Sequence, residues 1–257
     1  MGEEERAIKD KLQKLIERMQ ELRYKDFKVV RARKLVNELQ RKGVRGIDKF
    51  LRKLLDSVNN KEGYSDICKE GRFAIILARN GFSEIIFIKE EKKHRLPDVK
   101  ANCNRNTVYF EITRKRSKVD EWAEQPEDVE LPSGKPEDII SIIQRKMGQL
   151  ISGKMNILVF WSSTLAVLHL DMAEAFKCIQ QEINQNPGTY EKLSGVVFTE
   201  DEGFSIPTMK QYYLFKNENA SKPIGPHLAK KLKSLNALSP KQLKKKRERW
   251  SDILERN

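Results

Sequence analysis

The stretch Leu96–Arg116 reads LPDVKANCNRNTVYFEITRKR, and its pattern indicates that the fold contains a β-sheet. It contains two strand-like runs, Leu96–Asn102 and Thr107–Thr113, joined by the polar residues Asn104–Asn106. In the second run, apolar and polar residues alternate, as expected where successive side chains point to opposite faces of a sheet. The stretch therefore predicts a β-hairpin.

Each strand of this hairpin carries one acid, Asp98 near the start of the first and Glu111 near the end of the second. If the strands pair as neighbours, the two carboxylates converge on one face of the sheet. Two carboxylates held together repel each other unless a cation neutralises them, and their hard oxygen atoms suit Mg²⁺ or Mn²⁺. The hairpin thus predicts a divalent-cation site of the kind that phosphodiester hydrolysis uses.

Composition favours a phosphate-rich partner and a cytoplasmic location. The 257 residues are enough for one substantial core with an appendage, and the net charge of +13 favours nucleic acid through counterion release. The first ten residues, MGEEERAIKD, are too charged for a signal peptide, and the longest apolar stretch, residues 157–170, is too short and too polar to span a bilayer. Three scattered cysteines predict reduced thiols in a cytoplasmic protein without a membrane segment.

The order of predicted elements divides the chain into three parts. Helical periodicity over residues 3 to about 60 predicts two or three amphipathic helices, which either form an arm or fold back on the main domain. The elements expected next are, in order, a helix (65–80), a strand (84–89), the two hairpin strands, a helix (136–152), a buried strand (156–161), a helix (171–184) and two strands (195–199 and 211–216). We therefore expect an N-terminal helical arm (1–62), an α/β domain (63–220) and a basic helical tail (221–257). The arm is a candidate surface for homodimer formation.

The order helix, three strands, helix, strand, with Pro97-Asp98 on the second strand and Glu111 on the third, resembles the PD-(D/E)xK nuclease superfamily. The resemblance covers roughly residues 65 to 162. It implies a restriction-endonuclease-like αβββαβ core, with a mixed central sheet flanked by helices. It also implies a divalent-metal-dependent nuclease, a hydrolase acting on phosphodiester bonds in DNA.

The same resemblance implies the residues of the site. Asp98 and Glu111 become ligands of Mg²⁺ (or Mn²⁺), and an acid on the first helix, Glu70 or Asp66, completes the metal site. In the family, a lysine two positions after the second acid usually orients or activates the attacking water. Here that position is Thr113, which can hydrogen-bond a water but supplies no positive charge for electrostatic stabilisation.

Candidates for the missing charge lie on the continued second strand, on the first strand and on the following helix: Lys115, Lys100 and Lys146. Gln149 lies three residues beyond Lys146 on that helix and is a further candidate at the cleft, whereas for Gln144 a solvated helix face is an equal alternative. Cations after the second strand are expected to contact a nucleic-acid backbone, together with Lys100 and Gln149: Arg114, Lys115, Arg116 and Lys118.

Three functions remain open at this stage. The first is a metal-dependent DNA nuclease. The second is a catalytically decayed nuclease fold that binds nucleic acid without cleaving it, which Thr113 favours. The third is an interaction module in which the arm and the tail recruit a protein partner.

Overall fold

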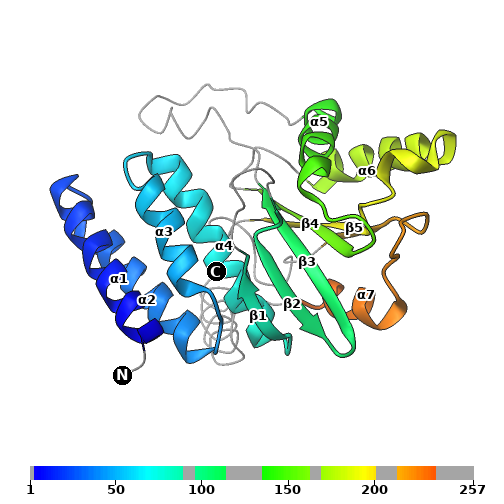
Figure 1. The fold of residues 1–257 in the computed structure, drawn as a ribbon. Coiled ribbons are helices and arrows are strands. Elements are labelled where there is room, and N and C mark those ends of the chain that lie inside the picture. Colours follow the sequence, from blue (N-terminus) through cyan, green and yellow to red (C-terminus); the bar gives the residue numbers. More distant parts are fainter. Residues whose placement is uncertain (1–2, 89–95, 114–134, 163–168, 201–212, 236–257) are drawn as a thin grey trace, which may run out of the picture. The chain divides into compact units, whose positions relative to one another are not determined.

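The computed structural model describes residues 3–88, 96–113, 135–162, 169–200 and 213–235 (Figure 1). The chain forms two compact units, Met1–Ile112 and Thr113–Asn257, which we call the first unit and the second unit. Both combine helices with strands, so the α/β class expected from the sequence is confirmed.

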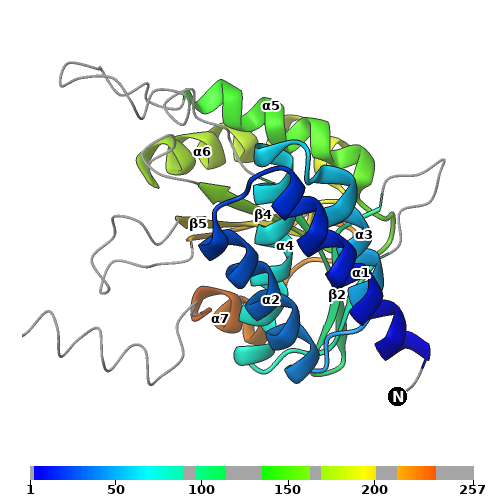
Figure 2. The same cartoon turned by 90° about the vertical axis from the view of Figure 1, so that its left-hand side faces the viewer.

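The first unit combines four helices with three antiparallel strands. Its elements are α1 (Glu3–Glu21), α2 (Asp26–Arg41), α3 (Ile47–Ser57), α4 (Lys61–Arg79), β1 (Ser83–Phe87), β2 (Val99–Cys103) and β3 (Asn106–Thr113), whose last residue opens the second unit. The strands follow the order β1-β2-β3. Helices α3 and α4 pack against β1, while α1 packs on α3 and α2 on α4, so α1 and α2 form the outer layer of this unit (Figures 1 and 2).

Of the three N-terminal helices, α3 packs on β1 and α4, and α1 and α2 pack on α3 and α4. Each buries the apolar face that its periodicity indicated, for example Leu15 of α1, Val36 of α2 and Phe50 of α3. Helix α4 begins earlier than predicted because the Asn60 side chain accepts hydrogen bonds from the backbone N–H groups of residues 62 and 63 and caps the helix.

The predicted hairpin is present. Val99 pairs with Phe110 and Cys103 with Asn106, so Asn106 belongs to β3 and the turn consists of Asn104 and residue 105 alone. Asn104 adopts a φ of +55°, a left-handed conformation that asparagine tolerates in tight turns.

The second unit is built around a mixed sheet. Its elements are α5 (Pro136–Lys146), a 3₁₀ turn (Met147–Gln149), β4 (Met155–Ser162), α6 (His169–Gln185), a second 3₁₀ turn (Pro187–Tyr190), β5 (Gly195–Glu200), β6 (Tyr213–Lys216) and α7 (Pro226–Lys233). Strands β4 and β5 are parallel, and β5 and β6 are antiparallel. As predicted, α5 begins with proline at its first turn, where the missing N–H has no intrahelical acceptor to lose.

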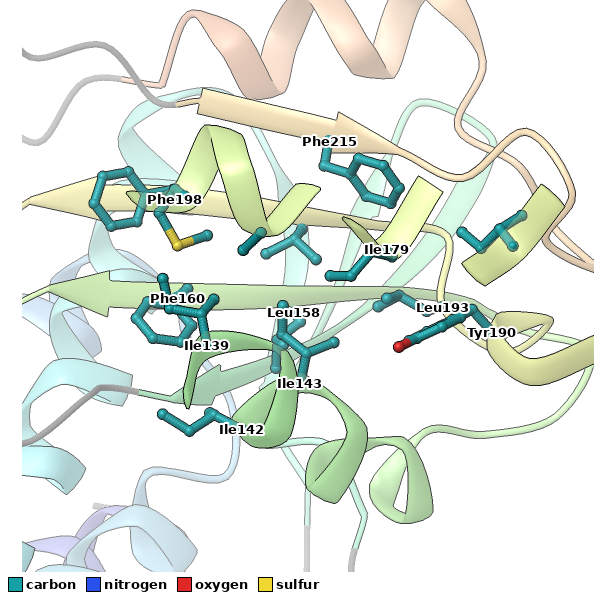
Figure 3. Packing of buried hydrophobic residues seen from close by; sticks show 14 of the residues in the cluster. Ile139, Ile142, Ile143, Leu158, Phe160, Ile179, Tyr190, Leu193, Phe198 and Phe215 are labelled. Atoms are coloured by element: carbon teal, nitrogen blue, oxygen red, sulfur yellow. The ribbon is translucent and has the colours of Figure 1, made fainter. Parts of the chain in front are cut away.

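The apolar run of β4 is buried on both faces, as the sequence predicted. Leu158 and Phe160 face the core formed with α5 and α6, where Ile139 and Ile143 of α5 pack beside them (Figure 3). Ile142 of α5 is also buried in this core, whereas residue 140 is only partly buried.

The element order α4-β1-β2-β3-α5-β4 is the predicted order, and pairing is both parallel and antiparallel. A restriction-endonuclease-like core stays a prediction, as do the boundaries at residues 62 and 220. The part of the predicted tail beyond residue 235 lies outside the described residues. Within the described ranges, no helix combines the length and apolar character that crossing a bilayer needs.

Candidate functional site: a lysine-bridged acidic cluster

Two acids of the first unit share one ammonium group. The Lys53 Nζ atom, on α3, donates hydrogen bonds to Glu70 Oε2 on α4 at 3.1 Å and to Asp98 Oδ1, just before β2, at 2.8 Å. Glu70 is 6% exposed and Asp98 is 8% exposed. Buried charges are stable only when they are paired and hydrogen-bonded, and these two carboxylates accept hydrogen bonds from the same cation.

Glu111 is the third acid at this place. Because Val99 pairs with Phe110, one further step of the antiparallel register sets Asp98 opposite Glu111, and directly opposite residues point to the same face. The second carboxylate oxygen of Asp98 accepts a hydrogen bond from the backbone N–H of Ile112 at 2.9 Å, which ties it to β3. Glu111 is only 2% exposed. The structure thus brings together the two acids of the hairpin, and we call Glu70, Asp98 and Glu111 the acidic cluster.

The electrostatics of the cluster disfavour the ionised form of Glu70. Burial raises the pKa of Glu70 well above its ordinary value, and repulsion from Asp98 and Glu111 raises it further, against the opposing attraction of Lys53. For Lys53, burial lowers the pKa, but attraction to Asp98 and Glu70 outweighs burial, so its pKa is raised and the ammonium stays charged. Glu70 and Asp98 therefore share one charged ammonium group, and Glu111 is a third buried acid beside them.

The chain is hydrogen-bonded to β1 just before the start of α3, the helix that carries Lys53. The backbone N–H of Arg45 donates to the Ile85 carbonyl at 2.9 Å, and the N–H of Phe87 donates to the Arg45 carbonyl at 3.0 Å. Gly46 follows with a φ of +72°, and a Cβ atom there would lie 2.8 Å from the Phe87 carbonyl oxygen. The start of α3 therefore needs glycine, both for its backbone conformation and for its close approach to β1.

A second close contact sets the distance between α3 and α4. The ring of Phe50 stacks on Phe87, with centroids 4.7 Å apart, and lies against Gly71, where a Cβ atom would come within 2.6 Å of Phe50 Cζ. Lys53 lies one turn after Phe50, and Glu70 directly precedes Gly71. The missing side chain at position 71 thus lets α3 approach closely enough for Lys53 to reach Glu70.

The donors of the cluster suit a divalent cation in chemistry, because all of them are carboxylates. Across the part of the chain that the structure describes, no group of three or more His, Cys, Asp or Glu side chains is arranged to hold a metal ion. In the arrangement shown, the Lys53 ammonium lies where Glu70 and Asp98 would meet a cation.

Three further residues of the predicted site lie on α4, β3 and β2. Asp66, the alternative acid of the first helix, is half-buried one turn before Glu70, and Glu70 is the acid that the structure joins to Lys53. Thr113 is the half-exposed last residue of β3, and Lys100 is half-buried on β2, opposite residue 109.

In the second unit, Lys146 donates a hydrogen bond to Gln149 at 3.1 Å, the contact that their spacing indicated. Gln144 contacts the hydroxyl of residue 190 at 3.2 Å. The predicted nucleic-acid contacts after β3, namely Arg114, Lys115, Arg116 and Lys118, lie outside the described residues.

Lys53 is the site residue that sequence reasoning missed. It was assigned to the N-terminal arm, and its helix carries another lysine, Lys49, at a similar half-buried position beside the apolar face. The position of Lys53 one turn after a buried phenylalanine is a weak signal, since solvated lysines commonly border the buried face of an amphipathic helix.

The fold and site define an α/β protein with a buried carboxylate cluster that is bridged by a lysine. Comparison of the chain with protein-family models, with curated proteins and with solved structures found no match. A functional assignment therefore has to be argued from the chemistry of the site.

Proposed function

We propose that this protein is a divalent-metal-dependent nuclease that hydrolyses phosphodiester bonds in DNA. Support comes chiefly from the convergence of Asp98 and Glu111, thirteen residues apart, with Glu70 of α4 in one buried place, where burial and repulsion from the other two acids raise the pKa of Glu70. Such an arrangement is costly for a protein unless the acids serve a cation.

Within this proposal, Asp98 and Glu111 hold Mg²⁺ or Mn²⁺, and Glu70 assists them. The metal, when bound, supplies a water of lowered pKa and neutralises charge on the scissile phosphate. Lys53 of α3 brings an ammonium group to these carboxylates, whereas Thr113 of β3 supplies none. The net charge of +13 favours binding of the DNA backbone.

The test is cleavage of supercoiled plasmid DNA in Mg²⁺ and in Mn²⁺ by the wild type and by Asp98→Asn and Glu111→Gln. Both substitutions keep the side-chain shape and remove the charge, so we expect cleavage to fall to the level of a metal-free control. Asp66→Asn is the matched control, because it removes an acid from the same helix that carries Glu70, and it should cleave as the wild type does. Cleavage at wild-type rates by both cluster variants, with circular dichroism showing an unchanged fold, would remove the proposal.

A second candidate is a nucleic-acid-binding protein that has lost cleavage. Two observations favour it. Lys53 already occupies the position between Glu70 and Asp98, and Thr113 stands where the family that the sequence resembles carries lysine. Fluorescence anisotropy with a labelled DNA duplex, run beside the cleavage assay, separates the two functions. Salt-sensitive binding with no cleavage in either metal supports the second candidate.

A further inference from the structure

We propose that Lys53 is the resident cation of the acidic cluster, and that a divalent metal binds there by displacing its ammonium group from Glu70 and Asp98. This inference rests on the metal site of the proposed function. It extends that function by assigning the N-terminal helices a role in the site, which neither the sequence pattern nor the resemblance gave them.

Competition follows from shared oxygen atoms. Lys53 Nζ is 3.1 Å from Glu70 Oε2 and 2.8 Å from Asp98 Oδ1, so it lies within hydrogen-bond distance of both carboxylates at once. A Mg²⁺ ion binds carboxylate oxygens at about 2.1 Å, which would bring two positive centres to the same pair of oxygens. A divalent ion and an ammonium group that contact the same carboxylate oxygens lie close together, and their repulsion is strong in a buried site. The two cations therefore exclude each other.

The second carboxylate oxygen of Asp98 offers the metal no simple alternative. It accepts the hydrogen bond from the backbone N–H of Ile112 at 2.9 Å and is thereby held against β3. A metal that bound Asp98 without disturbing Lys53 would have to compete with this bond. The ammonium is therefore the group that has to move.

The surroundings of Lys53 allow the ammonium to move while its helix stays in place. The start of α3 is fixed by the two backbone hydrogen bonds between Arg45 and β1, and its middle by Phe50 against Phe87 and Gly71. The lysine side chain itself is a flexible four-carbon stem, and it is 20% exposed, so a route to solvent exists. Without metal, the ammonium stays hydrogen-bonded to Glu70 and Asp98 and stabilises the first unit.

The experiment compares the wild type with Lys53→Met, which keeps the length of the side chain and removes its charge. Mn²⁺ affinity is measured by titration calorimetry, and thermal unfolding is measured in EDTA and in saturating Mn²⁺. We expect Lys53→Met to bind Mn²⁺ at least about tenfold more tightly than the wild type. We also expect it to unfold at a lower temperature in EDTA, and its unfolding temperature to rise more on addition of Mn²⁺ than that of the wild type. Lys49→Met, on the same helix and half-buried, is the matched control and should match the wild type in all three measurements.

Equal or weaker Mn²⁺ binding by Lys53→Met would overturn the inference, and so would an absence of Mn²⁺ binding in both proteins. If Lys53→Met does not fold, the wild type decides the question: the side-chain ¹⁵N signal of Lys53, assigned with Lys53→Arg, has to shift on addition of Mg²⁺, and an unchanged signal overturns the inference.

The outcomes for metal competition and for cleavage are separable. Tighter Mn²⁺ binding by Lys53→Met without DNA cleavage by any protein would keep the inference and remove the nuclease function. Cleavage that depends on Asp98, combined with Mn²⁺ affinity that is indifferent to Lys53, would keep the function and remove the inference.

Discussion

The first unit buries charged side chains, whereas the second unit buries neutral polar ones. Among the described residues, the buried polar groups of the first unit are Lys69, Glu70, Asp98 and Glu111, and those of the second are Asn156, Ser194, Thr199 and Asn217. Both units have apolar cores of large side chains, such as Phe50 and Phe110 in the first and the α5–α6–β4–β5 core in the second (Figure 3).

The neutral groups of the second unit serve its own backbone. The Asn156 amide hydrogen-bonds both backbone groups of Ile151 and the carbonyls of Lys154 and Lys192. The Asn217 side chain donates to two further carbonyls, those of residues 190 and 193. These bonds give partners to backbone N–H and carbonyl groups outside the strands. A structural role therefore accounts for the burial of Asn156 and Asn217.

The charges of the first unit need another explanation. Replacing a buried ion pair by apolar residues is often neutral or stabilising, so stability alone is a weak reason to keep one. The contrast between the units therefore favours the first unit as the place of the proposed function. Three predictions test this comparison beyond the experiments on the acidic cluster and Lys53.

The largest effect on stability is expected in the second unit. Asn156→Ala removes four hydrogen bonds and leaves buried backbone groups without acceptors or donors, so we expect a loss of about 3 kcal/mol in the free energy of unfolding. Urea denaturation measures it, and Asn184→Ala, whose amide bonds only to exposed Gln180, should change the free energy by less than about 0.5 kcal/mol. A large loss of DNA cleavage in folded Asn156→Ala would break the comparison.

An intermediate effect is expected where α3 meets α4. Gly71→Ala places a methyl group 2.6 Å from the Phe50 ring, which overpacks the contact and should cost about 2 kcal/mol. The displacement of α3 from α4 should also move Lys53 away from Glu70, so we expect Mn²⁺ affinity to rise, as we expect for Lys53→Met. Gly148→Ala is the control, because a Cβ atom there meets nothing within 4 Å, and thermal unfolding should show little change. Unaltered unfolding of Gly71→Ala would contradict the close approach of the two helices.

The smallest effect on stability concerns Cys68 of α4. Burial raises the pKa of its thiol to about 11, from an ordinary value of 9.0, so at pH 8 far less of it is thiolate than in the unfolded chain. We expect iodoacetamide to modify Cys68 about a hundredfold more slowly in the folded protein than in urea, as mass spectrometry of the modified peptide would show.

The raised pKa of Cys68 also fixes the sign of its pH dependence. Because the unfolded thiol loses its proton first, stability should be unaffected below pH 9 and should fall between pH 9 and pH 11. Equal modification rates in the folded and unfolded chains at pH 8 would show that the interior of the first unit admits water more freely than its buried charges imply.

Local patterns predicted much of the fold and part of the site. Alternation over residues 107–113 gave β3, and the run of β4 gave a strand buried on both faces. The placement of Asp98 and Glu111 on one face of the hairpin was also predictable, because the position of the turn determines the register of the two strands. These features depend on interactions between residues close in the chain.

Sequence alone thus determined the α/β class, the hairpin and the meeting of its two acids. Only the tertiary structure decided that Glu70 rather than Asp66 joins them, and that Lys53 from an N-terminal helix provides their cation. Helical periodicity tells which face of α3 is buried but not what that face meets, and a lysine at its border looks the same whether it is solvated or bridges two acids. The choice was made by a contact between distant parts of the chain, where Gly71 leaves room for Phe50 and brings the two helices together.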